Sequence, residues 1–144
     1  MTGLPQVAAI VLLRDDGAAL LQHRDDKPGL SHANKWVPPG GHADSGETLD
    51  ECARREFLEE TGYRLGEIHR LARFVDDHPR GFPLLELFVY WSRYDGHQAV
   101  TCQEGQALAF IRREDAGRYD IPPYLLALWD EALVAAGGAA SGHE

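Results

Sequence analysis

The sequence predicts a single domain that mixes helices and strands, of the α/β (α+β) class. Three observations predict it: several Val- and Ile-rich runs that end at turn residues, one strong helix signal in the middle of the chain, and an amphipathic segment near its end. The 144 residues, 44% hydrophobic and 26% charged, suit one globular core. We expect a single domain over residues 1–136 and a disordered tail of small residues over 137–144.

The expected strands share β-branched or aromatic residues and flanking turn signals. The turn Asp15-Asp16-Gly17 joins the first two of them as a hairpin. The run Pro38-Pro39-Gly40-Gly41 should be irregular, because proline and glycine disfavour regular structure and glycine allows the backbone to approach a ligand. Strands are predicted over residues 6–13, 18–23, 35–37, 63–75, 83–94 and 107–111.

Two helices complete the predicted architecture. Thr48 and Glu51 form a capping box that predicts a helix from residue 49 to about residue 61, and Gly62 stands where a C-terminal glycine belongs. A second helix opens at Pro122-Pro123 and carries a regular apolar face. We expect each helix to cover part of the sheet.

Composition excludes several classes of function. A net charge of -9 disfavours binding to a nucleic-acid polymer, which requires clustered Lys and Arg. Cys52 and Cys102 lack the spacing of a disulfide framework or a zinc site, so we expect free thiols. The longest apolar run, residues 7–13, is too short to cross a membrane. The N-terminus lacks the basic segment of a secretory signal, so we expect a cytoplasmic protein.

Acidic residues gather between residues 41 and 63, which hold five of the nine net negative charges. On the predicted helix, Glu56, Glu59 and Glu60 fall on one face, where like charges repel one another. A hard divalent cation reverses that repulsion, and carboxylate oxygens are its preferred ligands. Arg55, four residues before Glu59, is placed to brace the acids. The pattern predicts a metal site on this helix.

The same segment resembles a known motif. Its spacing is similar to the Nudix box, G-x5-E-x7-R-E-U-x-E-E-x-G-U, where U is apolar or aromatic, and every fixed position is filled. The match covers 23 residues; outside it the resemblance is looser. The matching residues are Gly41, Glu47, Arg55, Glu56, Phe57, Glu59, Glu60, Gly62 and Tyr63.

The resemblance implies an αβα sandwich around a mixed sheet. It also implies hydrolysis of a nucleoside diphosphate linked to another moiety, with Mg²⁺ or Mn²⁺ as cofactor. The metal ligands carried over from the family are the backbone carbonyl of Gly41 and the carboxylates of Glu56, Glu59, Glu60 and, from a distant loop, Glu104.

The expected chemistry needs a base that takes a proton from the attacking water. Glu59, Glu56 and Glu104 are the three candidates, and the sequence does not choose among them. Arg55 completes the expected catalytic set. A Nudix-like domain that only binds a ligand is the alternative of another class; such a domain would be expected to lose one or more box acids, whereas this chain keeps Glu56, Glu59 and Glu60.

The substrate is less well specified. We expect a nucleoside triphosphate, damaged or intact, that yields a monophosphate and pyrophosphate, with Arg24 and Trp36 as contacts. Pro79 lies near the position of a marker proline in ADP-ribose pyrophosphatases, so ADP-ribose and nucleotide sugars remain alternatives. The expected partner is thus a small nucleotide, without membrane or nucleic-acid polymer, and the protein should be a monomer or homodimer.

Overall fold

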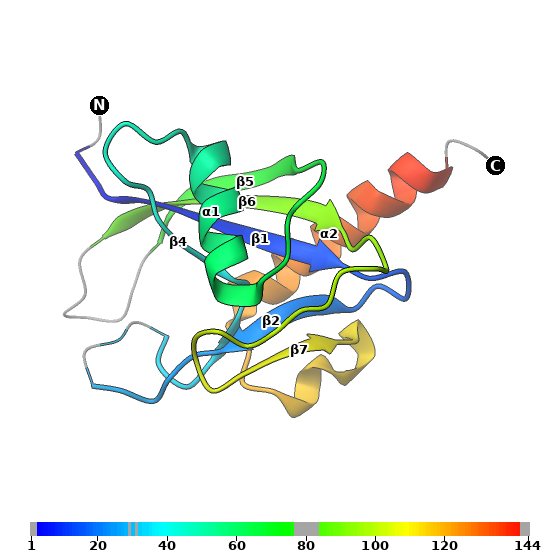
Figure 1. Ribbon diagram of the computed structural model, residues 1–144. Coiled ribbons are helices and arrows are strands. Elements are labelled where there is room, and N and C mark those ends of the chain that lie inside the picture. Colours follow the sequence, from blue (N-terminus) through cyan, green and yellow to red (C-terminus); the bar gives the residue numbers. More distant parts are fainter. Residues whose placement is uncertain (1–2, 29, 31, 77–83, 142–144) are drawn as a thin grey trace.

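The computed structural model describes residues 3–28, 30, 32–76 and 84–141, with the backbone alone for residues 76 and 138–141 (Figure 1). Two α-helices, one short 3-10 helix and seven strands occur in these ranges. In chain order they are β1 (Gln6–Leu13), β2 (Ala19–His23), β3 (Trp36–Val37), β4 (Gly40–His42), α1 (Leu49–Thr61), β5 (His69–Asp76), β6 (Leu85–Arg93), β7 (Ala107–Ile111), η1 (Arg113–Arg118) and α2 (Pro123–Ser141).

The described strands form one mixed sheet with the order β3-β2-β1-β6-β5, and β4 pairs with β1 while β7 pairs with β2. Strands β1 and β6 run parallel, from Gln6 beside Glu86 to Leu13 beside Arg93. The pairings of β1 with β2 and β4, of β2 with β3 and β7, and of β5 with β6 are antiparallel. A parallel pair at the centre of a sheet is buried on both faces, which explains the nearly continuous apolar sequence of β1.

The two helices cover opposite faces of the sheet (Figure 1). Successive β1 side chains alternate between them: Ile10 packs in the cluster that contains Phe57 of α1, whereas Val11 packs in the cluster that contains Trp129 of α2. The expected αβα arrangement around a mixed sheet is therefore confirmed. In the described part of the chain, no helix is long and apolar enough to span a membrane.

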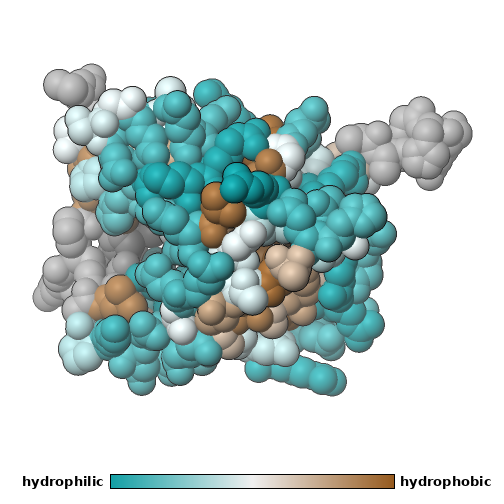
Figure 2. Space-filling view, viewed as in Figure 1, coloured by the Kyte–Doolittle hydropathy of each residue, from teal (hydrophilic) through white to brown (hydrophobic). Residues whose placement is uncertain are grey.

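Helix α1 has the ends that its sequence predicts. Thr48 Oγ1 accepts a hydrogen bond from Glu51 N at 3.1 Å, and Glu51 Oε1 accepts one from Thr48 N at 2.8 Å, which completes the capping box. Gly62 adopts a left-handed conformation with φ of 74° and donates its N–H to Leu58 O. The apolar stripe of α1 faces the sheet, and Figure 2 shows a mainly hydrophilic surface over the helix. The polar face is thus left for chemistry.

The Pro38–Gly41 region differs from the prediction. Residues 40–42 form strand β4, antiparallel to β1, because glycine has the N–H that proline lacks. A Cβ at Gly40 would collide with the backbone oxygen of Ala8, so this close pairing requires glycine. The predicted strand from residue 63 begins only at His69; residues 63–68 form a connection in which Arg64 N donates to Gln98 Oε1.

The second helix extends past residue 136, where the tail was expected to begin. Helix α2 runs from Pro123 to Ser141, and the domain over residues 1–136 with a disordered tail stays a prediction. Alanine is the best helix former, and Ala135 and Ala136 continue the helix up to Gly137, where glycine costs about 1 kcal/mol. Residues 142–144 lie outside the described residues.

Candidate active site

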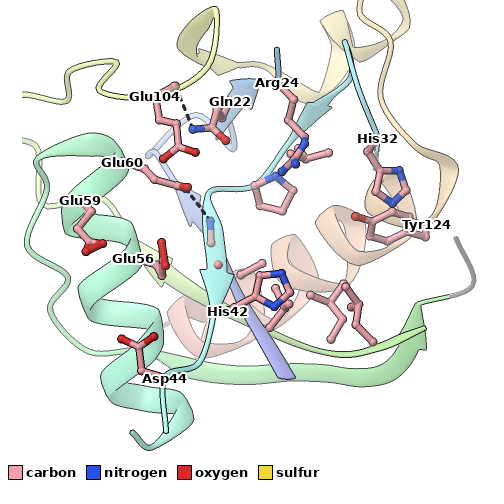
Figure 3. Close-up of a pocket in the computed structure, with 18 residues that line it drawn as sticks. Gln22, Arg24, His32, His42, Asp44, Glu56, Glu59, Glu60, Glu104 and Tyr124 are labelled. Atoms are coloured by element: carbon pink, nitrogen blue, oxygen red, sulfur yellow. Dashed lines mark hydrogen bonds between the residues drawn. The ribbon is translucent and has the colours of Figure 1, made fainter. Parts of the chain in front are cut away.

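A cavity of about 480 Å³ opens between the C-terminal half of α1, strand β4, the loop before β7 and the first turn of α2 (Figure 3). Glu56 and Glu60 point toward it from α1, Glu104 points toward it from the loop, and Glu59 lies farther out on the helix. The opposite wall is less acidic and partly apolar, and it comprises Val7, Ala9, Arg24, His32, Val37, Pro38, Leu85, Leu87 and Tyr124, whereas Gln22 lies beside Glu104. The cavity therefore has one acidic side and one mixed side.

Glu60 is the most buried of these acids, with 5% of its surface exposed. Its Oε1 accepts a hydrogen bond from Gly40 N at 2.9 Å. The pKa of Glu60 is raised to about 8, with burial as the largest cause; the charges of Glu104 and Glu56 contribute to the rise, and the Gly40 hydrogen bond opposes it. Ionisation of Glu60 is therefore unfavourable without a nearby positive charge.

Glu56 lies beside β4. Burial raises the pKa of its carboxyl group, the hydrogen bond from Arg55 opposes that effect, and the charges of Glu59 and Glu104 add to it. A Cβ on Gly41 would overlap the Glu56 carboxylate, so glycine at this position makes room for the acid.

Arg55 holds the acids of α1 and the preceding loop together. Its Nε and Nη2 donate to the two carboxylate oxygens of Glu47 at 2.6 and 2.9 Å, a bidentate pair. Its Nη1 donates to Glu56 Oε1 and Glu59 Oε2, both at 3.1 Å, and its Nη2 donates to His42 O at 3.1 Å. The hydrogen bond with Glu47 is the largest cause of the raised pKa of Arg55, and Glu56 and Asp44 also raise it. The contact with Glu59 is the one that the sequence spacing suggests.

The fold brings Glu104 to the acids of α1. Gln103 N donates to Glu60 O at 3.1 Å at the C-terminal end of α1, and Gln22 Nε2 donates to Glu104 O at 3.1 Å from β2. The charge of Glu104 contributes to the raised pKa of both Glu56 and Glu60. An acid far along the chain thus faces the same space as the helix acids.

The Gly41 carbonyl was expected to lie with the carboxylates as a metal ligand, but it points in another direction. Gly41 pairs with Ala8. Two residues away on either side, Ile10 N donates to Pro39 O and Ala43 N donates to Gln6 O. Hydrogen-bonded pairs recur every second residue in an antiparallel ladder, so Gly41 and Ala8 also form a hydrogen-bonded pair. The Gly41 carbonyl therefore points toward β1, and it also accepts the Cys52 thiol at 3.3 Å. Backbone polar groups alternate along a strand, so Gly40 faces away from β1, and its N–H meets Glu60.

The two expected substrate contacts have different surroundings. Trp36 does not line the cavity: its ring stacks on His23 at 4.7 Å between centroids and meets Tyr119 edge-on at 5.3 Å. Pairing of β3 with β2 packs the ring between these neighbours, outside the cavity, and the expected contact of Trp36 with substrate stays a prediction. Arg24 does line the cavity, and its buried Nε has no hydrogen-bond partner among the described residues. A donor of that kind suits an oxygen-rich ligand.

The residues present fit a divalent metal ion by their chemistry. Among the described residues, no three His, Cys, Asp or Glu side chains converge into a ready-made metal site. Arg55 holds two of the acids, and Glu60 is turned to Gly40 N. The donors around the cavity are nevertheless carboxylate oxygens, which suit Mg²⁺ or Mn²⁺. The mutual repulsion that raises two of the pKa values is what a cation relieves.

Several residues of the cavity were not predicted from sequence, among them Gln22, His32 and Tyr124. Gln22 had a visible signal, because it is a polar residue at the end of the apolar run of β2. His32 lies in a loop and Tyr124 in the first turn of α2, and only the tertiary fold brings their rings to a centroid distance of 5.9 Å.

Comparison with known proteins places this geometry in a family. The NUDIX domain family model matches residues 3–134, so the chain belongs to the Nudix family. The chain is 43% identical over 119 residues to the putative 8-oxo-dGTP diphosphatase of Bacillus subtilis, a match that covers 78% of this chain and 68% of that protein. It is 30% identical to the oxidized purine nucleoside triphosphate hydrolase of Danio rerio, over 67% of this chain and 60% of that protein.

The structural comparison supports the fold. The MutT NUDIX hydrolase of Burkholderia pseudomallei superposes with a TM-score of 0.77 at 21% identity, covering 88% of this chain and 96% of that chain. The chain spans between 20% and 60% of the length of the first three curated relatives that it matches. Activity and substrate therefore require an argument from the site itself.

Proposed function

We propose that the protein hydrolyses a nucleoside triphosphate to a nucleoside monophosphate and pyrophosphate, with Mg²⁺ or Mn²⁺ bound in the cavity. One observation carries this proposal: Glu56, Glu60 and Glu104 face the same space from α1 and a distant loop, opposite the unpartnered guanidinium nitrogen of Arg24. Carboxylates that hold a cation, opposite a donor for phosphate or base oxygens, form a site for a metal-bound nucleotide.

The proposed ligands are the carboxylates of Glu56, Glu59, Glu60 and Glu104, with the Gly40 carbonyl in place of the expected Gly41 carbonyl. When bound, Mg²⁺ or Mn²⁺ neutralises phosphate oxygens and polarises a water molecule.

Side chains of the protein supply the proton transfer. Glu56, Glu59 and Glu104 are the candidate bases, and a base of this kind contributes about 10²–10⁴-fold to the rate. Arg55 contacts Glu56 and Glu59 and fixes the direction of both carboxylates. Glu60 is held by Gly40 N, which suits a ligand better than a mobile base.

The mixed wall of the cavity supports a small nucleotide as substrate. Cavities of about 300–1,000 Å³ are typical of small-molecule sites, and this one measures about 480 Å³. Leu85 and Leu87 offer apolar contact to a base, and Tyr124 and His32 add aromatic rings. Relatives whose names specify 8-oxo-dGTP and oxidized purine nucleoside triphosphates favour a damaged deoxynucleotide among these substrates.

Two alternatives are kept. ADP-ribose or a nucleotide sugar would be cleaved by the same chemistry, but the proline that suggested it, Pro79, lies outside the described residues. A domain that only binds its ligand is disfavoured by the retention of Glu56, Glu59 and Glu60. We further propose that the protein acts in the cytoplasm as a monomer or homodimer, on nucleotides and not on nucleic-acid polymers, which its charge of -9 would repel.

A substrate panel with Mg²⁺, read by product identity, tests the proposal. Nucleoside triphosphates, oxidised and intact, should give a monophosphate and pyrophosphate. Predominant conversion of ADP-ribose to AMP and ribose phosphate would instead support the first alternative. Saturable nucleotide binding without any product would support the second.

A further inference from the structure

Gln22 is a buried amide beside the acidic loop. It lies in β2 after the apolar residues Ala19 to Leu21, is 4% exposed, and lines the cavity. Its Nε2 donates to the backbone carbonyl of Glu104 at 3.1 Å, and Figure 3 shows this bond beside the Glu104 carboxylate. Burying an amide costs free energy unless it is hydrogen-bonded, so its presence in an apolar strand requires an explanation.

The loop that carries Glu104 is attached on both sides of that residue. Gln103 N donates to Glu60 O at 3.1 Å, and Gln106 N donates to His23 O at 2.7 Å. Gly105 adopts φ of 85°, and a Cβ there would lie 2.7 Å from His23 O, so the loop also fits closely against β2. These neighbouring bonds come from backbone N–H groups, which any residue except proline supplies.

The bond at Glu104 itself is different, because it depends on a particular side chain. Gln22 Nε2 is the donor, and the neighbouring Cys102 thiol donates to the same carbonyl only weakly, at 3.3 Å. Without Gln22 the peptide between Glu104 and Gly105 could rotate, and the Glu104 carboxylate would move relative to Glu56 and Glu60. A displacement of about 1 Å in a catalytic group can cost 10²-fold in rate.

We propose that Gln22 is a positioning residue that holds Glu104 at the distance from Glu60 that metal binding and hydrolysis require. The inference rests on the proposed function, and it adds a residue of β2 to a site built from α1 and the loop. Gln22 acts through Glu104, and its contribution should vanish when Glu104 no longer carries a charge.

Gln22→Met keeps the length of the side chain and removes the donor. We expect kcat to fall about tenfold, KM for the nucleotide to change little, and the Mn²⁺ concentration for half-saturation to rise severalfold. Ser92→Ala is the matched control, since Ser92 is 1% exposed and its Oγ donates to Glu67 O at 2.7 Å outside the cavity. It should lower the melting temperature without changing kcat.

The decisive comparison repeats Gln22→Met in the Glu104→Gln background. In that background Gln22→Met should change kcat by less than about twofold, because both substitutions act through the Glu104 carboxylate. A full tenfold loss in that background would overturn the inference, since Gln22 would then act independently of Glu104. Should Gln22→Met fail to fold, Gln22→Asn, whose amide is one methylene too short, carries the same expectations.

Mn²⁺ binding measured by calorimetry separates this inference from the proposed function. If the wild-type protein turns over no nucleotide, the proposed function fails. Gln22→Met should even then weaken Mn²⁺ binding in the wild-type background and leave it unchanged in the Glu104→Gln background. Equal Mn²⁺ affinities of the wild type and Gln22→Met, together with equal kcat where turnover is seen, would overturn the inference alone.

Discussion

The two faces of the sheet differ in what their helices bury against it. On one face, α2 packs Leu125, Leu128 and Trp129 into an apolar cluster in which burial and helix formation favour the same structure. On the other face, α1 packs an apolar stripe but also buries Glu60 beside other acids, an arrangement that raises its pKa and disfavours the folded state. Both faces thus bury apolar side chains, but only the α1 face also holds acids that repel one another.

Helix α1 keeps its shape through local interactions. The capping box at Thr48, the left-handed Gly62 and the ion pairs of Arg55 each stabilise it. A cap contributes about 1 kcal/mol. The acids can therefore lie together before any cation binds. Three substitutions and one pH series test how far the two faces of the sheet are independent.

The largest effect is expected on the α2 face. Trp129 is fully buried, and its Nε1 donates to Gly17 O at 3.0 Å. Trp129→Ala should lower the free energy of unfolding by about 3–5 kcal/mol, because it leaves a large cavity. Urea denaturation measures this, with Val134→Ala, whose side chain is 74% exposed, as a control expected within about 0.5 kcal/mol. A small effect of Trp129→Ala would mean that the α2 face does not carry the stability.

On the α1 face the largest effect should be on activity. Glu60→Gln removes a proposed ligand charge but keeps an oxygen for Gly40 N, so kcat should fall by at least about 10²-fold while the fold stays intact. Steady-state kinetics and melting in EDTA at pH 8 measure both. Loss of several degrees of stability in EDTA would show that Glu60 is structural and that the two faces do not differ as described.

The pH dependence of stability sharpens the comparison. The pKa of Glu60 is raised from 4.5 to about 8 by burial, with the charges of Glu104 and Glu56 adding to the effect and Arg24 opposing it. The folded state therefore holds this proton more tightly than the unfolded state, and stability should fall as pH rises from about 4.5 to 8. Melting in EDTA across that range should show the decline, and Glu60→Gln should flatten it. An equal slope in both proteins would contradict the assignment to Glu60.

The smallest effect concerns the end of α1. Gly62→Ala places a Cβ in the left-handed conformation and 2.9 Å from Gln103 Nε2, so we expect a loss of about 1–2 kcal/mol. Gly66→Ala is the control, because nothing described lies within 4 Å of its Cβ position and its φ is not in the left-handed range. Unfolding by urea distinguishes them; equal stabilities would show that α1 does not depend on this cap.

Sequence patterns predicted the elements whose signals are local. The bounds of β1, β7 and α1 follow from hydrophobic runs and caps, and α1 has the predicted capping box. Strand β4 was missed because its pairing with β1 depends on a close approach that only the folded sheet provides. The extension of α2 to Ser141 was missed because small residues were interpreted as a tail.

The candidate site likewise has features that the sequence predicted and features that only the fold determines. Helical spacing placed Glu56, Glu59 and Glu60 together, and the family resemblance singled out Glu104, whose loop the fold brings to them. The direction of the Gly41 carbonyl follows from strand register, and the packing of Trp36 against His23 and Tyr119 follows from tertiary structure. Neither is visible in a single sequence, and the same holds for the bond from Gln22 to Glu104.

Parallel titration of metal binding and turnover tests the central claim, that the acids of α1 and Glu104 hold the cation on which hydrolysis depends. Protein treated with EDTA is titrated with Mn²⁺ while binding and pyrophosphate release are measured. The account predicts no turnover without metal, and activity that rises together with occupancy. Glu60→Gln should shift both curves to higher Mn²⁺, whereas Glu114→Gln, in η1 and outside the cavity, should shift neither. Full turnover in excess EDTA, or unchanged binding in Glu60→Gln, would contradict the account.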